Sequence, residues 1–132
     1  MPISAFQHIN LRSTDVERTH EFYVRILGLR VGDRPPFASS GYWLYVGDQP
    51  IVHLVQRHSG DTAIAGSGNL DHVAFSSVNF EGTRRALQAA GIPFLEAIVP
   101  PDGTLQILVN DPDGIKLELN FAPSSAGRSS NR

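Results

Sequence analysis

Four residues of types that bind divalent metals recur at matching places along the chain. His8 and His72 are 64 residues apart, and His53 and Glu118 are 65 residues apart. Imidazole nitrogens and carboxylate oxygens suit Zn, Ni, Mn, Co and Fe(II), and three or four such ligands leave coordination positions open for a substrate. The spacing therefore predicts one catalytic divalent-metal site, with the metal held by His8, His53, His72 and Glu118.

Each of these residues also has an ordinary structural interpretation. A lone histidine in a strand is more often a core or surface residue than a ligand, and Glu118 could pair with Lys116 as a simple ion pair. The matched spacing favours metal binding, because chance rarely places four candidates at equivalent positions of two segments. His20 and His58 have no counterpart at this spacing, so we interpret them as a helix residue and a linker residue.

The surrounding sequence predicts the elements that would position these side chains. Polar and apolar residues alternate in two segments that carry the first ligand of each half, which predicts strands over residues 3–12 and 70–77. A helix with an N-cap at Ser13 or Thr14 is predicted to follow the first strand. Its buried face is expected to hold Val16, His20, Tyr23, Val24 and Leu27, and Gly28 is expected to end it. A second helix is predicted over residues 79–90, with strands at 29–33, 41–47, 50–56, 93–99, 104–109 and 115–121.

This order is βαβββ twice. The sequence predicts an α+β fold in which two βαβββ modules form a half-barrel-like mixed sheet with helices on its outer face. Val52 and Leu54 flank His53, and Leu117 and Leu119 flank Glu118. Since neighbouring strand residues point to opposite faces, the helices should cover the apolar face and leave the ligands on the concave face.

The predicted modules form one domain over residues 1–121. Module one covers residues 3–56, a linker rich in Gly and Ser covers 57–69, and module two covers 70–121. Residues 122–132 have almost nothing to bury and are expected to be a disordered tail.

Composition excludes several classes of protein. The chain has 132 residues, of which 41% are hydrophobic and 18% charged, as in a globular domain. A formal net charge of -2 without a basic cluster argues against nucleic-acid binding. No apolar run approaches the roughly 20 residues needed to cross a bilayer, and residues 1–13 lack the pattern expected of a secretory signal. Without cysteine there are no disulfides, and the expected location is the cytoplasm.

Three motifs resemble the vicinal oxygen chelate superfamily, which includes glyoxalase I, extradiol dioxygenases, fosfomycin-resistance proteins, methylmalonyl-CoA epimerase and bleomycin-binding proteins. They are HINLRSTDVERTHEFYVRILGL from His8, LDHVAF around His72 and NDPDGIKLELNF around Glu118. The resemblance covers residues 3–121 and implies paired βαβββ modules around a metal. It implies that these three residues are the widely shared ligands and that residue 53 is the fourth. Glyoxalase I has Glu at that position and the epimerases have Gln.

A histidine at position 53 changes the expected chemistry. With one carboxylate instead of two, the bound metal stays more positive and its water more acidic. Glu118 and His53 are then the candidate catalytic acid–base groups. Arg12 is similar in position to an arginine of glyoxalase I that holds a carboxylate, so it is predicted to bind an anionic substrate unless it is simply exposed at a strand end. Trp43 and Tyr45 are predicted to line the pocket, with residues 33–41 forming a loop at its mouth.

Four functions fit this pattern. The first is a glyoxalase-like lyase or isomerase acting on a small substrate chelated through neighbouring oxygens. The second is an Fe(II) extradiol-type dioxygenase in which His53 stays off the metal. The third is a fosfomycin-type resistance transferase, and the fourth is a non-enzymatic drug-binding protein. The exposed sheet edges of one module pair also predict a homodimer, with metal sites near the module interface.

Overall fold

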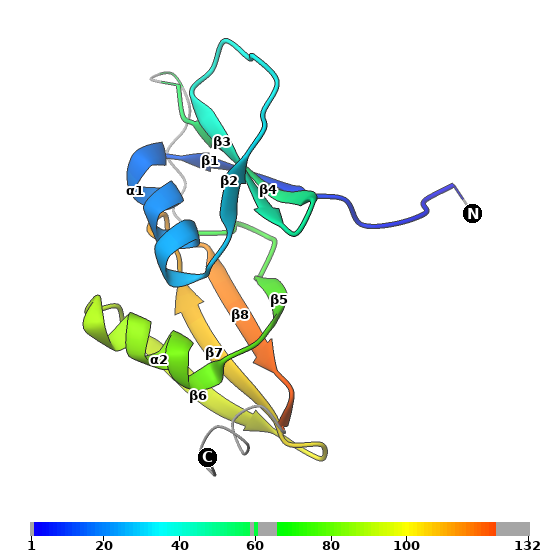
Figure 1. Cartoon of the computed structure of the whole chain (residues 1–132), viewed down its shortest axis with the longest axis vertical. Coiled ribbons are helices and arrows are strands. Elements are labelled where there is room, and N and C mark those ends of the chain that lie inside the picture. The colour runs from blue at the N-terminus through cyan, green and yellow to red at the C-terminus, as the bar shows by residue number, and fades with distance from the viewer. Residues whose placement is uncertain (1, 59, 61–65, 124–132) are drawn as a thin grey trace. The chain divides into compact units, whose positions relative to one another are not determined.

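The computed structural model describes residues 2–58, 60 and 66–123 of the chain, which divides into two compact units, Met1–Thr62 and Ala63–Arg132. Each unit contains one four-stranded mixed sheet accompanied by helical turns (Figure 1). Residues 59 and 61–65 of the predicted linker at 57–69, and residues 124–132 of the predicted tail at 122–132, lie outside the described residues. The prediction of a single domain over residues 1–121 stays a prediction.

The first unit has the predicted order of elements. Its strand order is β1-β4-β3-β2, with β1 parallel to β4 and the other pairs antiparallel. The elements are β1 (Ile9–Ser13), α1 (Val16–Glu21), a π-helical turn η1 (Phe22–Ile26), β2 (Arg30–Gly32), β3 (Gly41–Val46) and β4 (Gln49–Gln56).

The second unit repeats this plan. Its strand order is β5-β8-β7-β6, again with the first pair parallel and the others antiparallel. The elements are β5 (Val73–Ser77), α2 (Phe80–Ala89), β6 (Phe94–Val99), β7 (Thr104–Asn110) and β8 (Lys116–Phe121). The predicted α+β class with two βαβββ modules is therefore confirmed.

The repeat extends to the register of the strands. In the first unit His53 of β4 lies opposite Asn10 of β1, and in the second unit Glu118 of β8 lies opposite Ala74 of β5. The residue two positions before each partner is a histidine, His8 or His72. Each unit therefore carries one histidine just before its first strand and one ligand-type residue on its last strand.

The first strand of each unit is shorter than its alternating sequence predicts. β1 begins at Ile9 and β5 at Val73, so His8 and His72 lie one residue before these strands instead of on them. The parallel ladders with β4 and β8 start only at Ile9 and Val73. The alternation of polar and apolar residues predicts only which side chains share a face. A strand also needs a neighbouring backbone to pair with, so it begins where the ladder begins.

The first helix also differs from the prediction. Asp15 is its N-cap and accepts a hydrogen bond from the Arg18 backbone nitrogen, whereas the Ser13 hydroxyl contacts Thr19 Oγ1 at 2.7 Å. The helix widens into the π-turn η1, which shifts the following residues around its axis. The buried positions are Val16, Thr19, Phe22 and Tyr23, while His20 and Val24 are half-buried.

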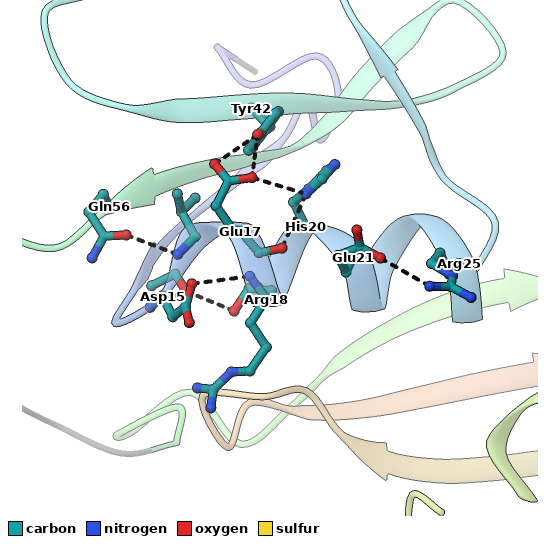
Figure 2. Close-up of polar contacts among 11 residues, drawn as sticks. Asp15, Glu17, Arg18, His20, Glu21, Arg25, Tyr42 and Gln56 are labelled. Atoms are coloured by element: carbon teal, nitrogen blue, oxygen red, sulfur yellow. Dashed lines mark hydrogen bonds and ion pairs between the residues drawn. The ribbon is translucent and has the colours of Figure 1, made fainter. Parts of the chain in front are cut away.

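A polar cluster attaches α1 to β3 (Figure 2). The Tyr42 hydroxyl donates to the Glu17 carboxylate, with distances of 2.7 and 2.8 Å to its two oxygens. The His20 ring stacks on the Tyr42 ring with centroids 4.1 Å apart. Gln56 of β4 accepts a hydrogen bond from the backbone nitrogen of Val16 at 2.9 Å. His20 is thus a helix residue that contributes to packing, as predicted.

The apolar residues of both sheets face the helices. Val52 and Leu54 are fully buried in the first unit, as Leu117 and Phe121 are in the second. Phe80 of α2 meets Phe121 edge-on, with centroids 5.3 Å apart. Burying one face of each last strand in this way leaves the ligand-type residue between the apolar ones on the opposite face.

Candidate functional site

His72 and Glu118 of the second unit lie side by side. Nε2 of His72 is 3.4 Å from Oε1 of Glu118, and their side chains are 37% and 22% exposed. Two donor atoms about 2.1 Å from a common ion lie about 3.0 to 3.4 Å apart at angles between 90° and the tetrahedral angle. This pair therefore has the spacing that a divalent ion requires.

The hydrogen bond from His72 to Asp71 leaves Nε2 available as a ligand in the neutral ring. Its Nδ1 lies 2.8 Å from Oδ2 of Asp71, and a carboxylate only accepts, so Nδ1 carries a proton. In the neutral ring Nε2 then has a lone pair that faces the Glu118 carboxylate. Two lone pairs repel unless a proton or a metal ion lies between them. A carboxylate that orients a histidine in this way is a common feature of metal sites.

Asn120 holds the other oxygen of Glu118. Its Nδ2 donates to Oε2 of Glu118 at 2.9 Å, and its Oδ1 accepts from Nε2 of Gln106 on β7 at 2.9 Å. These contacts turn Oε1 toward His72. Asn120 and Gln106 were not predicted as site residues. Their positions could have been anticipated, because Asn120 lies two residues after Glu118 and so shares its face.

Lys116 does not pair with Glu118 and bonds to Asp71 instead. Its Nζ lies 3.1 Å from Oδ2 of Asp71. The hydrogen bond from His72 and then the one from Lys116 lower the pKa of Asp71 below its ordinary value. The ordinary interpretation of Glu118 as a partner of Lys116 is therefore wrong, and Asp71 is a further site residue that the sequence analysis missed.

A tight turn sets the start of β8, which carries Glu118. The side chain of Asp111 accepts hydrogen bonds from the backbone nitrogens of Asp113 and Ile115 at 2.8 and 2.9 Å. Gly114 has a φ of +83°, a conformation that costs glycine little. The Asp-Pro-Asp-Gly motif therefore acts locally, by closing the turn and fixing the register in which β8 begins.

The corresponding pair of the first unit has a different arrangement. The rings of His8 and His53 are stacked, with centroids 3.8 Å apart and planes 13° from parallel. Trp43 of β3 stacks on His53 with centroids 4.0 Å apart. His53 is buried, with 8% of its surface exposed. Three rings thus form one stack in which His53 is the middle member.

The surroundings of His53 define its protonation. Nε2 lies 3.1 Å from the Pro50 carbonyl oxygen, which only accepts, so Nε2 carries the proton and Nδ1 has the lone pair of the neutral ring. Burial lowers the pKa of His53 most, and repulsion from His8 and from Arg34 lowers it further, while the Pro50 contact opposes this. His53 is therefore neutral at pH 7, the state that binds a metal or accepts a proton.

The stacked arrangement of His8 and His53 prevents the two rings from binding one metal ion together. An imidazole lone pair lies in the plane of its ring, and two nearly parallel planes share no point close to both rings. His8 and His53 can therefore direct lone pairs at one ion only after one ring rotates. Among residues 2–58, 60 and 66–123, no three His, Asp or Glu side chains gather closely enough to bind one ion.

A cavity of about 430 Å³ adjoins the ring stack in the first unit. That volume fits a small organic ligand. The cavity is lined by Gln7, His8, Asn10, Arg34, Phe37, Ser39, Trp43, His53, Leu54 and Val55. The loop expected over residues 33–41 therefore does contribute to the cavity.

The three predicted substrate-binding residues have different surroundings. Trp43 lines the cavity, while neither Arg12 nor Tyr45 is among its lining residues. Arg12 is exposed on β1. The Tyr45 ring lies over Gly32, and its hydroxyl donates to the Asp33 carbonyl oxygen at 2.6 Å. In the described structure Tyr45 thus supports the loop.

Arg34 and Phe37 are lining residues that the sequence analysis did not single out. The Arg34 guanidinium donates to Ser39, with 3.0 Å to its backbone oxygen and 3.3 Å to its hydroxyl, and lies 5.0 Å from the centre of the Phe37 ring. The available signal was an arginine and an aromatic residue in a loop already expected at the mouth of the pocket.

No helix in the described part of the chain is long and apolar enough to cross a membrane.

Comparison with known proteins adds the family. The model of a family described as the Glyoxalase/Bleomycin resistance protein/Dioxygenase superfamily matches residues 5–119. A relative named lactoylglutathione lyase, from Escherichia coli O157:H7, is 31% identical over 129 residues, which cover 92% of this chain and 94% of the relative.

Solved structures share the fold. A glyoxylase/bleomycin resistance protein/dioxygenase domain from Frankia sp. EAN1pec aligns with a TM-score of 0.74 at 21% identity, over 91% of this chain and 98% of that one. The genomically encoded fosfomycin resistance protein FosX from Listeria monocytogenes aligns with a TM-score of 0.71 at 18% identity, over 91% of this chain and 94% of that one.

Proposed function

Because this chain belongs to the Glyoxalase/Bleomycin resistance protein/Dioxygenase superfamily, we propose that it is a divalent-metal-dependent lyase or isomerase. Its substrate is a small molecule that presents two neighbouring oxygens to the metal. The proposed ligands are His8, His53, His72 and Glu118. The metal is one of Zn, Ni, Mn, Co and Fe(II), to which imidazole and carboxylate are suited.

One observation carries the metal assignment. His72 contacts Asp71 through Nδ1 and places Nε2 3.4 Å from a carboxylate oxygen of Glu118, a spacing that two ligands of one ion have. The donor set therefore fits a divalent ion in the second unit. In the first unit the donor chemistry also fits, but one of the rings of His8 and His53 has to rotate out of the stack.

A bound divalent ion would supply Lewis-acid polarisation of the two substrate oxygens. The chain itself would then supply the base that moves a proton between adjacent carbons of the substrate. Oε1 of Glu118 and Nδ1 of His53 are the candidates, and either would act as the base only when it is detached from the metal. The second oxygen of Glu118 is held by Asn120 and the second nitrogen of His53 by Pro50. The lyase named among the relatives supports this reaction class.

The ring stack favours a second candidate, an Fe(II) extradiol-type dioxygenase. If His53 remains stacked on Trp43, three residues are left as ligands: His8, His72 and Glu118. Two histidines and a carboxylate leave three coordination positions, enough for a chelating diol together with O₂. In that reaction His53 would act beside the metal as an acid or base.

Two measurements test these proposals. Calorimetric titration of the metal-free protein with each of the five ions should show one ion per chain, and binding of none of them would contradict a metal-dependent enzyme. The metal-loaded protein should then catalyse the formation of lactoylglutathione or the isomerisation of a related substrate. The rate without oxygen should equal the rate in air. Ring cleavage of catechols by the Fe(II) protein in O₂ at a kcat above about 1 s⁻¹ would favour the dioxygenase instead.

A further inference from the structure

The guanidinium of Arg34 has donor capacity that its protein contacts do not use. A guanidinium has five N–H donors. Ser39 accepts one from Nη1 and one from Nη2. The Nε of Arg34 is buried without a hydrogen-bond partner in the described structure. Within that structure Arg34 also forms no ion pair, so its positive charge is not compensated by a carboxylate.

The position of this guanidinium is built into the fold. A Cβ atom at Gly41 would clash with the Leu54 carbonyl oxygen of β4 and would lie 2.9 Å from Nη2 of Arg34, so the glycine leaves room for both. Ser39 holds the guanidinium from the loop, and the Phe37 ring lies beneath it with its centre 5.0 Å away. Arg34 is thus held in place before any ligand arrives, which reduces the ordering cost of binding.

The cavity beside Arg34 has one sign of charge. None of its lining residues is acidic, and Arg34 is the single Arg or Lys among them. A guanidinium offers one positive charge and parallel N–H groups, which match the charge and the planar geometry of a single carboxylate. The rest of the wall includes two aromatic rings, those of Phe37 and Trp43.

We propose that Arg34 is the substrate-recognition residue of this cavity and that the substrate is a small organic carboxylate with a flat apolar group. The carboxylate pairs with the guanidinium of Arg34, and the apolar group packs against Phe37 and Trp43. This replaces Arg12 by Arg34 as the anion-binding residue. That the ligand of this cavity is a substrate rests on the proposed function. That Arg34 binds a carboxylate there does not.

Trp43 provides the measurement, because it is the one tryptophan of the chain. The full-length, metal-free protein is titrated with 3-phenylpropanoate and with its uncharged counterpart 3-phenylpropanamide, and tryptophan emission is followed. The carboxylate should change the emission saturably and bind at least tenfold more tightly than the amide. In Arg34→Gln this preference should disappear, and in Arg34→Lys part of it should return.

Arg30→Gln is the matched control. Arg30 also donates to a backbone oxygen, that of Gly47 at 2.7 Å, and lies 5.0 Å from the centre of an aromatic ring, that of Tyr45, yet it does not line the cavity. Its substitution should leave the affinity for 3-phenylpropanoate within twofold. Equal affinities for acid and amide in the unaltered protein would overturn the inference, as would a loss of affinity in Arg30→Gln or Arg12→Gln as large as in Arg34→Gln.

The inference and the proposed function fail separately. Metal affinity is measured by calorimetry on the same Arg34→Gln protein, where it should be unchanged, because Arg34 is not a proposed ligand. If the carboxylate binds but no metal does, the metal-dependent function is wrong and the recognition site stands. If metal binds but the carboxylate shows no preference over the amide, the assignment of Arg34 is wrong and the metal site stands.

Discussion

Asn120 donates a 2.9 Å hydrogen bond to Oε2 of Glu118 and thereby leaves Oε1 to face His72. The contact joins two side chains of one strand that are two residues apart and share a face. It fixes the orientation of a carboxylate that would otherwise rotate freely about its last bond. Several predictions for metal binding depend on this orientation and on the two pairs of ligand-type residues.

Removing the Asn120 amide should weaken metal binding without removing a ligand. Asn120→Ala is expected to lower the affinity for Zn or Ni by about 10- to 100-fold, as is typical when the partner of a ligand is lost. Calorimetric titration measures the change. Asn110→Ala, an exposed substitution on β7 of the same sheet, is the control and should leave the affinity unchanged. Equal affinities for both variants would contradict the orienting role of Asn120.

The ligand residues should differ in their importance. His72→Ala and Glu118→Gln are each expected to abolish measurable metal binding, while His53→Ala should only weaken it, because the stack with His8 and Trp43 holds His53 away from a shared ion. His20→Ala removes a histidine that packs on Tyr42 and should not change the affinity. Retention of full affinity in His72→Ala would show that the ion binds elsewhere.

The contact between Tyr42 and Glu17 should make stability depend on pH in the alkaline range (Figure 2). The hydrogen bond to Glu17 is the main cause that raises the pKa of Tyr42 above its ordinary value of 10.0. A raised pKa means that this contribution is fully present below the unfolded-state pKa and is lost as pH rises through the folded-state pKa.

Tyr42→Phe is therefore expected to lower the free energy of unfolding by about 1 kcal/mol at pH 7, the usual size of one partly exposed hydrogen bond. The difference from the unaltered protein should shrink above about pH 10. Urea denaturation at both pH values measures it. Glu17→Gln should give a similar loss at pH 7. A difference that stays constant up to pH 12 would mean that the tyrosine contributes through packing alone.

The exposed sheet edges of one module pair predict a homodimer. Light scattering at micromolar concentration should give twice the mass of the chain. Mixing metal-free His53→Ala with metal-free Glu118→Gln should create a fraction of sites with full affinity if two chains share each site, whereas neither variant has such sites alone. A monomer that binds one ion with full affinity would contradict the prediction.

The spacing of ligand-type residues determined much about this protein. Matching intervals between His8 and His72 and between His53 and Glu118 predicted an internal repeat, which the register of β1 with β4 and of β5 with β8 confirmed. This succeeds because strand periodicity is a local property of the backbone, so position along the chain determines the face. Apolar neighbours such as Val52 and Leu117 then identified the buried face.

Only the tertiary structure decided how the side chains meet. The stack of His8 on His53, the bond of Lys116 to Asp71 and the place of Arg34 in the cavity wall each depend on rotamers and on neighbours distant in sequence. Residue type says which bonds a side chain can form, but the packed surroundings select among them. For the same reason Arg12, the predicted anion-binding residue, does not line the cavity, whereas Arg34 of the loop over residues 33–41 does.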